Sequence, residues 1–390
     1  MDTQPLRFGI IGVGNMGKTH ARNFKEGKSA GAVLTAICDT NKEKLKTIAT
    51  EVGVKAFTRY TDLLDSGLVD AVIVATPHYW HPAMTIAAAR RGIHVLCEKP
   101  IAVTIGPAKM MIEECRKANV KLGLMFMLRM RPATAKMMEI VRSGVLGDIF
   151  RVSMVGSSWY RAQSYYNSGG WRGTWLGEGG GILMNQGPHS LDLYQYVAGL
   201  PKTVTANVQT RTHQIEVENT ANAILDYGGG KMGYIYATTA EAPGVEEMYI
   251  SGSKASLISR DGKLRLGKLV MPLEEHIRTA ENGFEAPKTE WEDVVIEGED
   301  TAHPGVIAQF VKAVRENAPL IADGQDGLNQ LTVCNAIYLA GFTGKTVSLP
   351  LDDQAMERLV TKLARTRGKP GCENLRRPAM RDLKKLMADA

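Results

Sequence analysis

The chain has 390 residues, 44% of them hydrophobic and 23% charged, which is the balance of an ordinary water-soluble globular protein. This length exceeds one typical domain, so we expect two domains, each with its own core. The formal net charge is +6 without any block of like charges, and no apolar run reaches 18 residues, so we expect no nucleic-acid or membrane partner.

The first predicted elements are a buried strand over residues 8–11 and a helix over residues 15–27. Between them stand Gly12, Gly14 and Gly17 in the spacing G-x-G-x-x-G, which is typical here of a dinucleotide-binding turn. Gly12 permits the tight turn, Gly14 lets the backbone approach a pyrophosphate, and Gly17 lets the helix pack closely on the strand. Asn15 and Met16 begin the helix, whose free N–H groups face the phosphates.

The second predicted strand, residues 33–39, ends at Asp39, 22 residues beyond Gly17. An acidic side chain at this place accepts hydrogen bonds from the adenosine ribose hydroxyls. Its charge would repel a 2′-phosphate, so the sequence favours NAD over NADP, although Lys42 and Lys44 nearby keep NADP open. The alternative is a solvated aspartate at the strand end, or a cap for the helix that begins near residue 41.

Strands and helices continue to alternate up to residue 125. Strands are expected at residues 69–76, 93–97 and 121–125, and helices at residues 81–91 and 105–118. This alternation specifies a parallel, doubly wound sheet, whose ligands bind at the carboxyl ends of the strands. The cofactor-binding residues expected at these ends are Thr76, Pro77, His78, His81, Glu98 and Lys99.

From residue 148 the chain is rich in β-segments, expected at residues 149–157, 203–212, 220–227, 231–239, 246–251 and 255–259. They predict a large open, mostly antiparallel sheet. Helices are expected at residues 133–143, 186–198, 304–317, 325–341 and 352–367.

We therefore expect three parts: a dinucleotide-binding domain (residues 1–130), a substrate-binding and oligomerisation α/β domain (131–366), and a basic C-terminal tail or arm (367–390). In the last part Met380, Leu383 and Met387 recur at helical spacing. That spacing favours an arm that contacts a neighbouring subunit over a disordered end.

Five motifs resemble those of the Gfo/Idh/MocA oxidoreductase family, named for glucose–fructose oxidoreductase and inositol dehydrogenase. In order they are Gly12-x-Gly14-x-x-Gly17, Ala75-Thr-Pro-x-x-x-His81, Glu98-Lys99-Pro100, Gly144-x-x-Gly147 and Gly179-Gly-Gly-x-x-x-Asn185-x-x-x-His189-x-x-Asp192. The resemblance implies an N-terminal Rossmann domain, then an α/β domain whose open sheet forms oligomer contacts, here in a homodimer or homotetramer. It also implies hydride transfer between NAD(P) and a hydroxyl-bearing carbon of a sugar or cyclitol.

Three positions depart from the usual pattern of this family. Asn185 stands where members that oxidise inositols often carry Asp, and His78 stands where the family often has Asn. The segment Leu128-Arg129-Met130-Arg131-Pro132 replaces the family's N/R-R-F-x-P. Asn185 resembles another subset of sugar dehydrogenases, so it changes the expected substrate and not the expectation of activity.

Lys99, His189 and Asn185 are the expected catalytic residues. Oxidation of a secondary alcohol needs a base for the hydroxyl proton and charge stabilisation at the developing alkoxide. Lys99 would hydrogen-bond the reacting oxygen, and His189 would act as the base. Asn185 would bind a substrate hydroxyl and Asp192 would orient the base or contact substrate, because their spacing from His189 places them on one helix face. The alternatives are a surface lysine and a histidine satisfied within the core.

Residues 159–175 are dense in aromatic residues, glycine and arginine. Aromatic rings stack on sugar C–H surfaces, and arginine binds hydroxyls or an anionic substituent. We expect this segment to form a wall of the substrate pocket; the alternatives are a packed loop or a subunit contact. The expected substrate-binding residues are Lys99, Arg129, Tyr160, Arg172, Trp175, Asn185, His189, Asp192 and His303.

The sequence thus predicts an NAD-dependent dehydrogenase that oxidises a secondary hydroxyl of a sugar, glycoside or cyclitol. A glycosidase that transiently oxidises C3 uses the same first step and stays open, as does a non-enzymatic sugar-sensing regulator, which would need neither Lys99 nor His189. The five cysteines share no metal-like spacing, so we expect reduced thiols and no metal. Because no apolar leader precedes the first strand, we expect a cytoplasmic protein.

Overall fold

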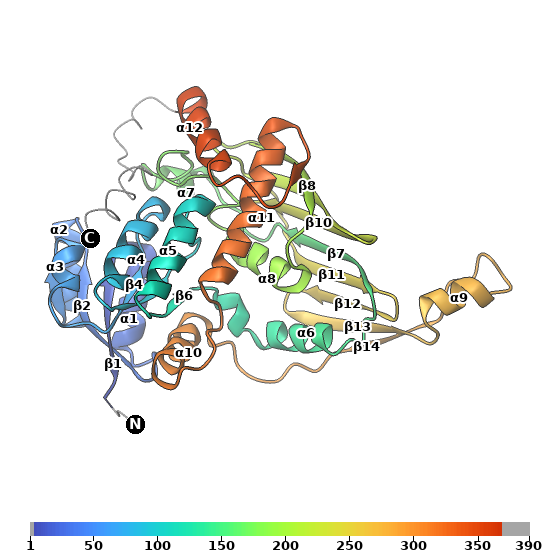
Figure 1. The fold of residues 1–390 in the computed structure, drawn as a ribbon, viewed down its shortest axis with the longest axis horizontal. Coiled ribbons are helices and arrows are strands. Elements are labelled where there is room, and N and C mark those ends of the chain that lie inside the picture. Colours follow the sequence, from blue (N-terminus) through green and yellow to red (C-terminus); the bar gives the residue numbers. More distant parts are fainter. Residues whose placement is uncertain (1–3, 369–390) are drawn as a thin grey trace.

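The structure, a computed structural model, describes residues 4–368 and contains two sheets that lie side by side (Figure 1). Sheet A has six parallel strands in the order β3-β2-β1-β4-β5-β6. They are β1 (Leu6–Ile11), β2 (Ala32–Cys38), β3 (Lys55–Phe57), β4 (Ala71–Val74), β5 (His94–Cys97) and β6 (Leu122–Leu124). The order reverses at β1, so the ligand crevice of such a sheet lies at the carboxyl end of this strand. The predicted doubly wound sheet is confirmed.

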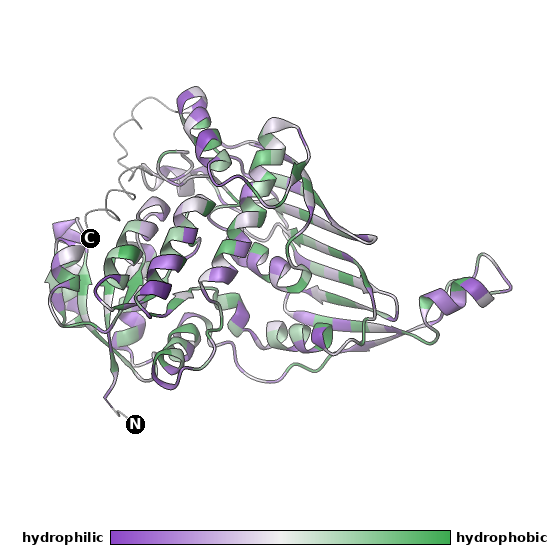
Figure 2. Ribbon diagram, in the orientation of Figure 1, coloured by the Kyte–Doolittle hydropathy of each residue, from purple (hydrophilic) through white to green (hydrophobic). Residues whose placement is uncertain are grey.

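Helices cover the central strands of sheet A, which explains why these strands are mostly apolar. They are α1 (Asn15–Lys25), α2 (Lys42–Val52), α3 (Tyr60–Leu64), α4 (His81–Ala89) and α5 (Ile105–Lys117), with a short 3₁₀ turn η1 (His78–Trp80). All four residues of β4 are buried. A strand that is buried on both faces has no place for polar side chains, in agreement with the hydropathy of Figure 2.

Sheet B has nine strands in the order β14-β13-β12-β11-β7-β10-β9-β8-β15. They are β7 (Ile149–Gly156), β8 (Thr203–Gln209), β9 (Thr220–Gly228), β10 (Lys231–Thr238), β11 (Glu246–Gly252), β12 (Ala255–Arg260), β13 (Lys263–Leu269), β14 (Thr289–Asp293) and β15 (Val347–Ser348). Neighbouring strands are antiparallel except β7 and β10, which run parallel. The predicted mostly antiparallel sheet is therefore confirmed.

One face of sheet B is covered by helices and the other is open. The helices of this part are α6 (Pro132–Arg142), α7 (Gln163–Asn167), α8 (Pro188–Ala198), α11 (Gly324–Thr343) and α12 (Ala355–Arg367), preceded by the 3₁₀ turn η2 (Met127–Met130). Helix α8 packs on β7 and α11 on β8. The strands alternate buried and exposed residues, and the exposed set on β9 and β10 includes Ile224, Met232 and Tyr234.

Helix α10 (Ala302–Glu316) belongs by sequence to the expected second domain, yet it packs on sheet A. Val306, Ile307 and Phe310 are buried against the β1 side, and the rings of Phe310 and Phe8 lie 6.1 Å apart. The chain therefore returns to its first sheet after completing most of the second. This return carries His303, at the start of α10, toward the strand ends of sheet A.

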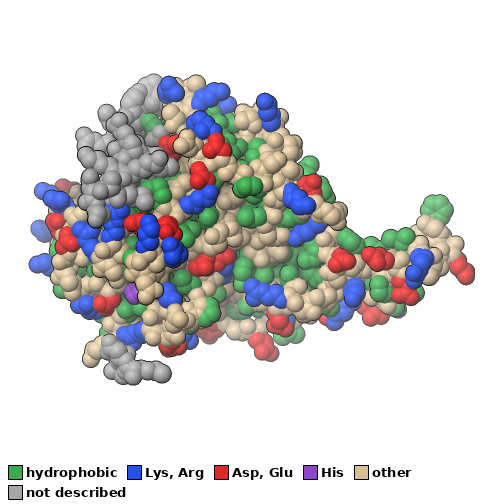
Figure 3. Space-filling view, in the orientation of Figure 1, with side chains coloured by type: hydrophobic (Ala, Val, Ile, Leu, Met, Phe, Trp, Pro, Cys, Tyr) green, Lys and Arg blue, Asp and Glu red, His purple; other side chains and the backbone are tan. Residues whose placement is uncertain are grey.

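Several elements escape the sequence-based expectation. They are β3, α3, α7, β13, β14, β15 and α9 (Leu273–Thr279). Helix α9 lies on a hairpin that projects from the body of the molecule (Figure 1). These segments are short or largely exposed, so they carry little hydrophobic periodicity. Acidic and basic side chains are interspersed on the face shown in Figure 3.

Four cysteines (Cys38, Cys97, Cys115 and Cys334) are buried, and none of them forms a disulfide with another described residue. No helix within residues 4–368 is long and apolar enough to cross a membrane. The expected arm at residues 376–387 and Cys372 lie outside the described residues.

Candidate active site

A cavity of about 950 Å³ runs along the carboxyl ends of the strands of sheet A and reaches the segments before α8. Sheet A contributes the expected cofactor residues Gly12, Gly14, Asn15, Met16, Asp39, Thr76, Pro77, His78, Glu98 and Lys99. The later part of the chain contributes Trp159, Arg161, Tyr165, Trp171, Arg172, Asn185, Gln186, His189 and His303. One cavity thus joins the glycine turn to Lys99, Asn185 and His189.

The glycine turn is closed by contacts that only glycine allows. Gly12 has φ +93°, and a Cβ there would lie 2.7 Å from the carbonyl oxygen of Ala75. A Cβ on Gly17 would lie 1.8 Å from the carbonyl oxygen of Gly12, so a side chain at residue 17 is excluded. At Gly14 a Cβ would meet no protein atom within 4 Å, although this residue lines the cavity. A pyrophosphate fits the open space at Gly14 beside the first turn of α1.

Asp39 is oriented by two backbone N–H groups. Its Oδ2 accepts a hydrogen bond from Val13 at 2.8 Å, and its Oδ1 accepts one from Asn41 at 2.8 Å. Each carboxylate oxygen keeps capacity for a further hydrogen bond, and the residue lines the cavity. The donor set therefore fits a ribose diol in the place expected for a dinucleotide. The residue that caps α2 is its neighbour Asn41, which accepts from Lys44 N–H, and not Asp39.

Lys99 is held at the middle of the cavity. Its Nζ donates to the backbone carbonyl of Asn185 at 2.6 Å, so a residue before α8 fixes the lysine that follows β5. Burial lowers the pKa of Lys99, and the negative charges of Glu98 and Glu178 oppose this effect. The ammonium group is therefore placed between two carboxyl groups of the site, where small changes in charge alter its proton affinity.

Glu98 lies behind Lys99 in a buried pair with a histidine of α1. Its Oε1 lies 2.8 Å from His20 Nε2, and both side chains are nearly inaccessible. Burial by itself would raise the pKa of Glu98. The hydrogen bond and charge of His20 outweigh this effect of burial, so that the pKa of Glu98 falls to about 2. The ring of His20 also contacts that of His303, with centroids 5.4 Å apart. Glu98 therefore stays ionised and supports the positive charge of Lys99.

His189 is the second residue of α8 and lines the cavity. Its ring stacks on Trp159 with centroids 6.5 Å apart, and the edge of Phe126 packs nearby. Burial and the neighbouring charge of Lys99 lower the pKa of His189 well below its usual value, so the imidazole is neutral at pH 7. Its Nδ1 is buried without a hydrogen-bond partner among the described residues. A neutral imidazole is able to accept a proton.

Asn185 does not lie on α8, so the expected polar line on one helix face is wrong. The helix begins at Pro188, whose fixed φ and missing N–H suit the first helical position, and Asn185 precedes it in a turn. Asn185 still reaches the cavity, because its Nδ2 donates to Tyr165 Oη at 3.1 Å and to Glu178 Oε1.

Glu178 and Tyr165 are site residues that sequence reasoning missed. Glu178 is 1% exposed, and its Oε2 accepts from Gly173 N–H at 2.6 Å. Burial raises the pKa of Glu178 to about 7 despite this bond and that from Asn185. The available signal was position alone: Glu178 immediately precedes the glycine triplet, and Tyr165 lies inside the aromatic segment.

The glycine triplet is fixed by a second buried glutamate. Glu218 accepts N–H groups of Gly181 and Leu183 at 3.0 Å each and the hydroxyl of Tyr338 at 2.7 Å. A Cβ on Gly181 would lie 1.6 Å from the carbonyl oxygen of Glu218, and one on Gly180 would lie 2.1 Å from the hydroxyl of Tyr338. The triplet therefore lets three segments meet behind Asn185, and it does not line the cavity.

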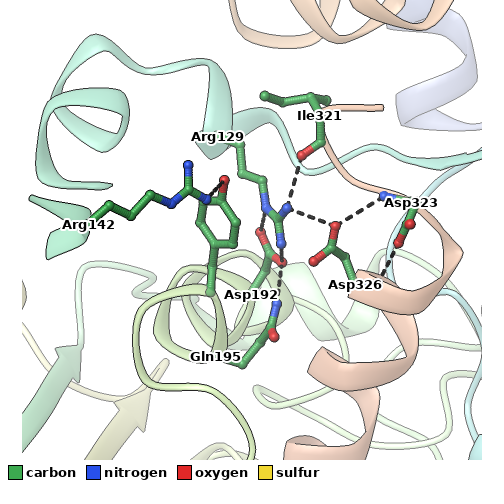
Figure 4. A network of polar contacts seen from close by, with 8 residues as sticks. Arg129, Arg142, Asp192, Gln195, Ile321, Asp323 and Asp326 are labelled. Atoms are coloured by element: carbon green, nitrogen blue, oxygen red, sulfur yellow. Dashed lines mark hydrogen bonds and ion pairs between the residues drawn. The ribbon is translucent and has the colours of Figure 1, made fainter. Parts of the chain in front are cut away.

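Arg129 and Asp192 lie away from the cavity, in a buried ion pair (Figure 4). Arg129 Nη2 and Nε donate to the two oxygens of Asp192 at 2.6 and 2.8 Å. Arg129 Nη1 donates to Asp326 Oδ2 at 3.0 Å and to the carbonyl of Ile321 at 2.9 Å. The pair fastens η2 to α8 and the start of α11, so the structure does not support the expected contacts of Arg129 and Asp192 with substrate.

Four other expected residues do not line the cavity. Trp175 is fully buried, and its indole N–H donates to the carbonyl of Glu216 at 3.0 Å. Tyr160 is 54% exposed, outside the cavity wall. His81 lies beneath the site, with ring nitrogens 2.8 Å from the carbonyl oxygens of Pro100 and Thr76, and Gly17 acts through packing. Arg172 and His303 line the cavity as expected.

No group of three or more His, Cys, Asp or Glu in residues 4–368 is arranged to hold a metal ion. Two family models match the chain: the oxidoreductase family with NAD-binding Rossmann fold over residues 6–126, and the GFO/IDH/MocA C-terminal domain over residues 134–258. The chain belongs to the GFO/IDH/MocA family of oxidoreductases. The resemblance read from the motifs is therefore confirmed.

Several of the proteins similar to this chain are named as dehydrogenases. Myo-inositol 2-dehydrogenase of Thermotoga maritima is 26% identical, with 83% of this chain and 92% of the relative covered. D-glucoside 3-dehydrogenase of Escherichia coli is 27% identical, with 90% and 99% covered. The WlbA dehydrogenase of Bordetella pertussis, solved with NADH and UDP-GlcNAcA, is similar in structure with a TM-score of 0.76 and 29% identity, covering 90% of this chain and all of that one.

Proposed function

We propose that this protein is an NAD-dependent dehydrogenase that oxidises a secondary hydroxyl of a sugar, glycoside or cyclitol. The observation that carries the proposal is the single cavity in which the glycine turn, Lys99 and a neutral His189 meet. When bound, NAD supplies the hydride acceptor. The residues that would hold it are Gly12, Gly14, Asn15, Met16, Asp39, Thr76, Pro77, His78, Glu98 and Lys99.

Lys99 and His189 would have different roles at the reacting hydroxyl. The ammonium group of Lys99 would donate a hydrogen bond to the reacting oxygen and stabilise the charge that develops there. The hydroxyl proton would pass to His189, which accepts it because burial keeps the imidazole neutral. Asn185 would bind a substrate hydroxyl, with Glu178 holding its amide in place.

We propose NAD in preference to NADP because Asp39 is charged and fixed. Two backbone N–H groups hold both of its oxygens in the cavity, so a 2′-phosphate would meet a carboxylate that is not free to turn away. The choice of a sugar or cyclitol draws support from relatives named as dehydrogenases of myo-inositol and D-glucosides.

The test is reduction of NAD by the purified protein in the presence of a panel of sugars, glycosides and cyclitols. Lys99→Ala and His189→Ala should each lower kcat by about 10²–10⁴-fold, the usual contribution of a positioned acid–base group. Lys109→Ala is the control, since Lys109 is an exposed lysine that pairs with Asp353. Full activity in both site variants would overturn the assignment, and glycoside cleavage without net NAD reduction would instead indicate the glycosidase.

We also propose a homodimer or homotetramer, with sheet B at the contact, in the cytoplasm. The oligomer is supported by the exposed apolar side chains of Ile224, Met232 and Tyr234 on the open face of sheet B. The location is supported by the four buried thiols that form no disulfide. Sedimentation of Met232→Glu tests the contact: a charge within it should reduce the oligomer to smaller species.

A further inference from the structure

The hydroxyl of Tyr165 is surrounded by more hydrogen-bond donors than it can accept. Arg172 Nη1 donates to it at 2.6 Å, Gln186 Nε2 at 3.0 Å and Asn185 Nδ2 at 3.1 Å. A phenol oxygen has two lone pairs and adds an O–H donor of its own. The donor cluster, defined here as Arg161, Tyr165, Arg172, Asn185 and Gln186, therefore lacks acceptors, and all five residues line the cavity.

Two guanidinium groups of the donor cluster lie beside the ring of Tyr165. Arg161 lies 5.1 Å from the centroid of the Tyr165 ring, and Arg172 lies 4.5 Å from it. Within residues 4–368, neither arginine forms an ion pair with Asp or Glu, whereas Arg129 forms two. Arg161 Nη1 instead donates to the backbone carbonyl of Tyr160 at 2.8 Å. Half-buried guanidinium groups without a carboxylate are strong anion-binding groups.

The acidic residues near this cavity are already committed elsewhere. Among the described residues that line it, Asp39 is held by the backbone near the glycine turn, and Glu98 is paired with His20. Glu178 bonds to Asn185, and burial leaves it partly neutral near pH 7. Lys99 adds a further positive group to the same cavity. The positive charge of Arg161 and Arg172 around the donor cluster is therefore only partly compensated.

We propose that the donor cluster binds an anionic substituent, a carboxylate or a phosphate, on the sugar that this protein oxidises. Such a group supplies the acceptors that Tyr165 lacks, and the fork of Arg161 suits its paired oxygens. The inference rests on the proposed function, because it takes the occupant of this part of the cavity to be the substrate.

The experiment measures binding to the full-length protein already saturated with NADH, so that the phosphates of the cofactor do not compete for the arginines. Isothermal titration compares D-glucose with D-glucuronate, which differ at one carbon, and with glucose 6-phosphate. We expect one of the two anions to bind at least roughly tenfold more tightly than glucose, the size of a charge-assisted hydrogen bond. Tighter glucuronate indicates a carboxylate, and tighter glucose 6-phosphate indicates a phosphate.

Arg161→Gln should abolish most of this preference, and Arg161→Lys, which keeps the charge but loses the fork, should retain part of it. Arg260→Gln is the matched control, because it removes the same charge from the exposed end of β12, where Arg260 pairs with Glu247 at 3.6 Å. Melting temperature and NADH affinity are measured for each variant to show that it is folded.

Equal affinity for glucose and both anions, no saturable anion binding, or an unchanged preference in Arg161→Gln would each overturn the inference. So would a loss confined to NADH affinity, which would assign Arg161 to the cofactor. Anion binding without NAD reduction by any sugar would support the anion subsite and refute the dehydrogenase activity. Reduction of NAD by neutral sugars alone, without anion binding, would support the dehydrogenase activity and refute the anion subsite.

Discussion

Replacing Asp192 with Asn tests whether the buried ion pair behind α8 supports the fold and not the substrate. Asp192 is 0% exposed and Arg129 5%, and two hydrogen bonds join them. Removing one partner of a buried pair costs about 3–5 kcal/mol, because the other charge stays in a dry environment. Arg129 would keep its bonds to Asp326 and the carbonyl of Ile321, so we expect the lower end, about 3 kcal/mol.

Differential scanning calorimetry measures this loss. At about 2.1 cal/mol/K per residue, the unfolding entropy of a 390-residue chain that unfolds as a unit is about 0.8 kcal/mol/K, so Tm should fall by about 4 °C. Asp65→Asn is the control, since Asp65 forms a solvent-exposed pair with Arg91, and such pairs contribute little to stability.

Kinetics separate a structural role of Asp192 from a substrate contact. Asp192 does not line the cavity, so KM for the sugar should stay close to that of the unaltered protein. We expect a modest fall in kcat, because loosening α8 would also displace His189, which lies on the same helix. A large rise in KM with an unchanged Tm would refute this reasoning and restore the substrate contact expected from the sequence.

Three further predictions concern the two ends of the cavity. Gly17→Ala should unfold the turn and abolish NAD binding, whereas Gly14→Ala should fold with an unchanged Tm and bind NAD more weakly. Equilibrium titration with NAD measures both affinities, and equal NAD affinity of the two variants would contradict the packing argument. Asp39→Ser should lower the ratio of kcat/KM with NAD to kcat/KM with NADP. An unaltered ratio would show that Asp39 does not contact the ribose. Because the pKa of Glu178 is raised to about 7 in the folded protein, its stabilising contribution is complete below about pH 4.5 and is lost as the pH rises through 7. In Glu178→Gln, Tm should therefore fall less between pH 5 and 8 than it does in the unaltered protein. An unchanged dependence of Tm on pH would show that the Glu178 carboxyl group is not kept neutral by burial.

Much of sheet A was predictable because its signals are local. Covered strands are apolar runs, and the glycine turn requires residues without Cβ at fixed spacing. The second half was harder to assign, because its short strands and exposed hairpin show weak periodicity. Helix α10 illustrates the limit: its own pattern predicts a helix, but nothing local indicates that Phe310 packs against Phe8.

Some residues of the candidate site were likewise predictable from the sequence, and others were not. The strand-end position of Lys99 and the motif around His189 were sufficient to place both residues in one cavity. The spacing argument for Asn185 failed because Pro188 delays the start of the helix. Glu178 was not recognised because a glutamate beside glycines has no distinctive pattern, and its raised pKa depends on burial by distant segments.

The sequence by itself determined the dinucleotide turn, the parallel sheet and the family, because the positive φ of Gly12, the contact of Gly17 with the Gly12 carbonyl and the alternation of strands and helices are local features of the chain. Only the tertiary structure decided which polar residues of the second half face the cavity. Asp192 is removed from it by Arg129, 63 residues away, since a buried charge requires a partner wherever the fold supplies one. Among the described residues, Arg161 and Arg172 form no ion pair with an acidic side chain, and this difference from Arg129 is the basis for the proposed anionic substrate.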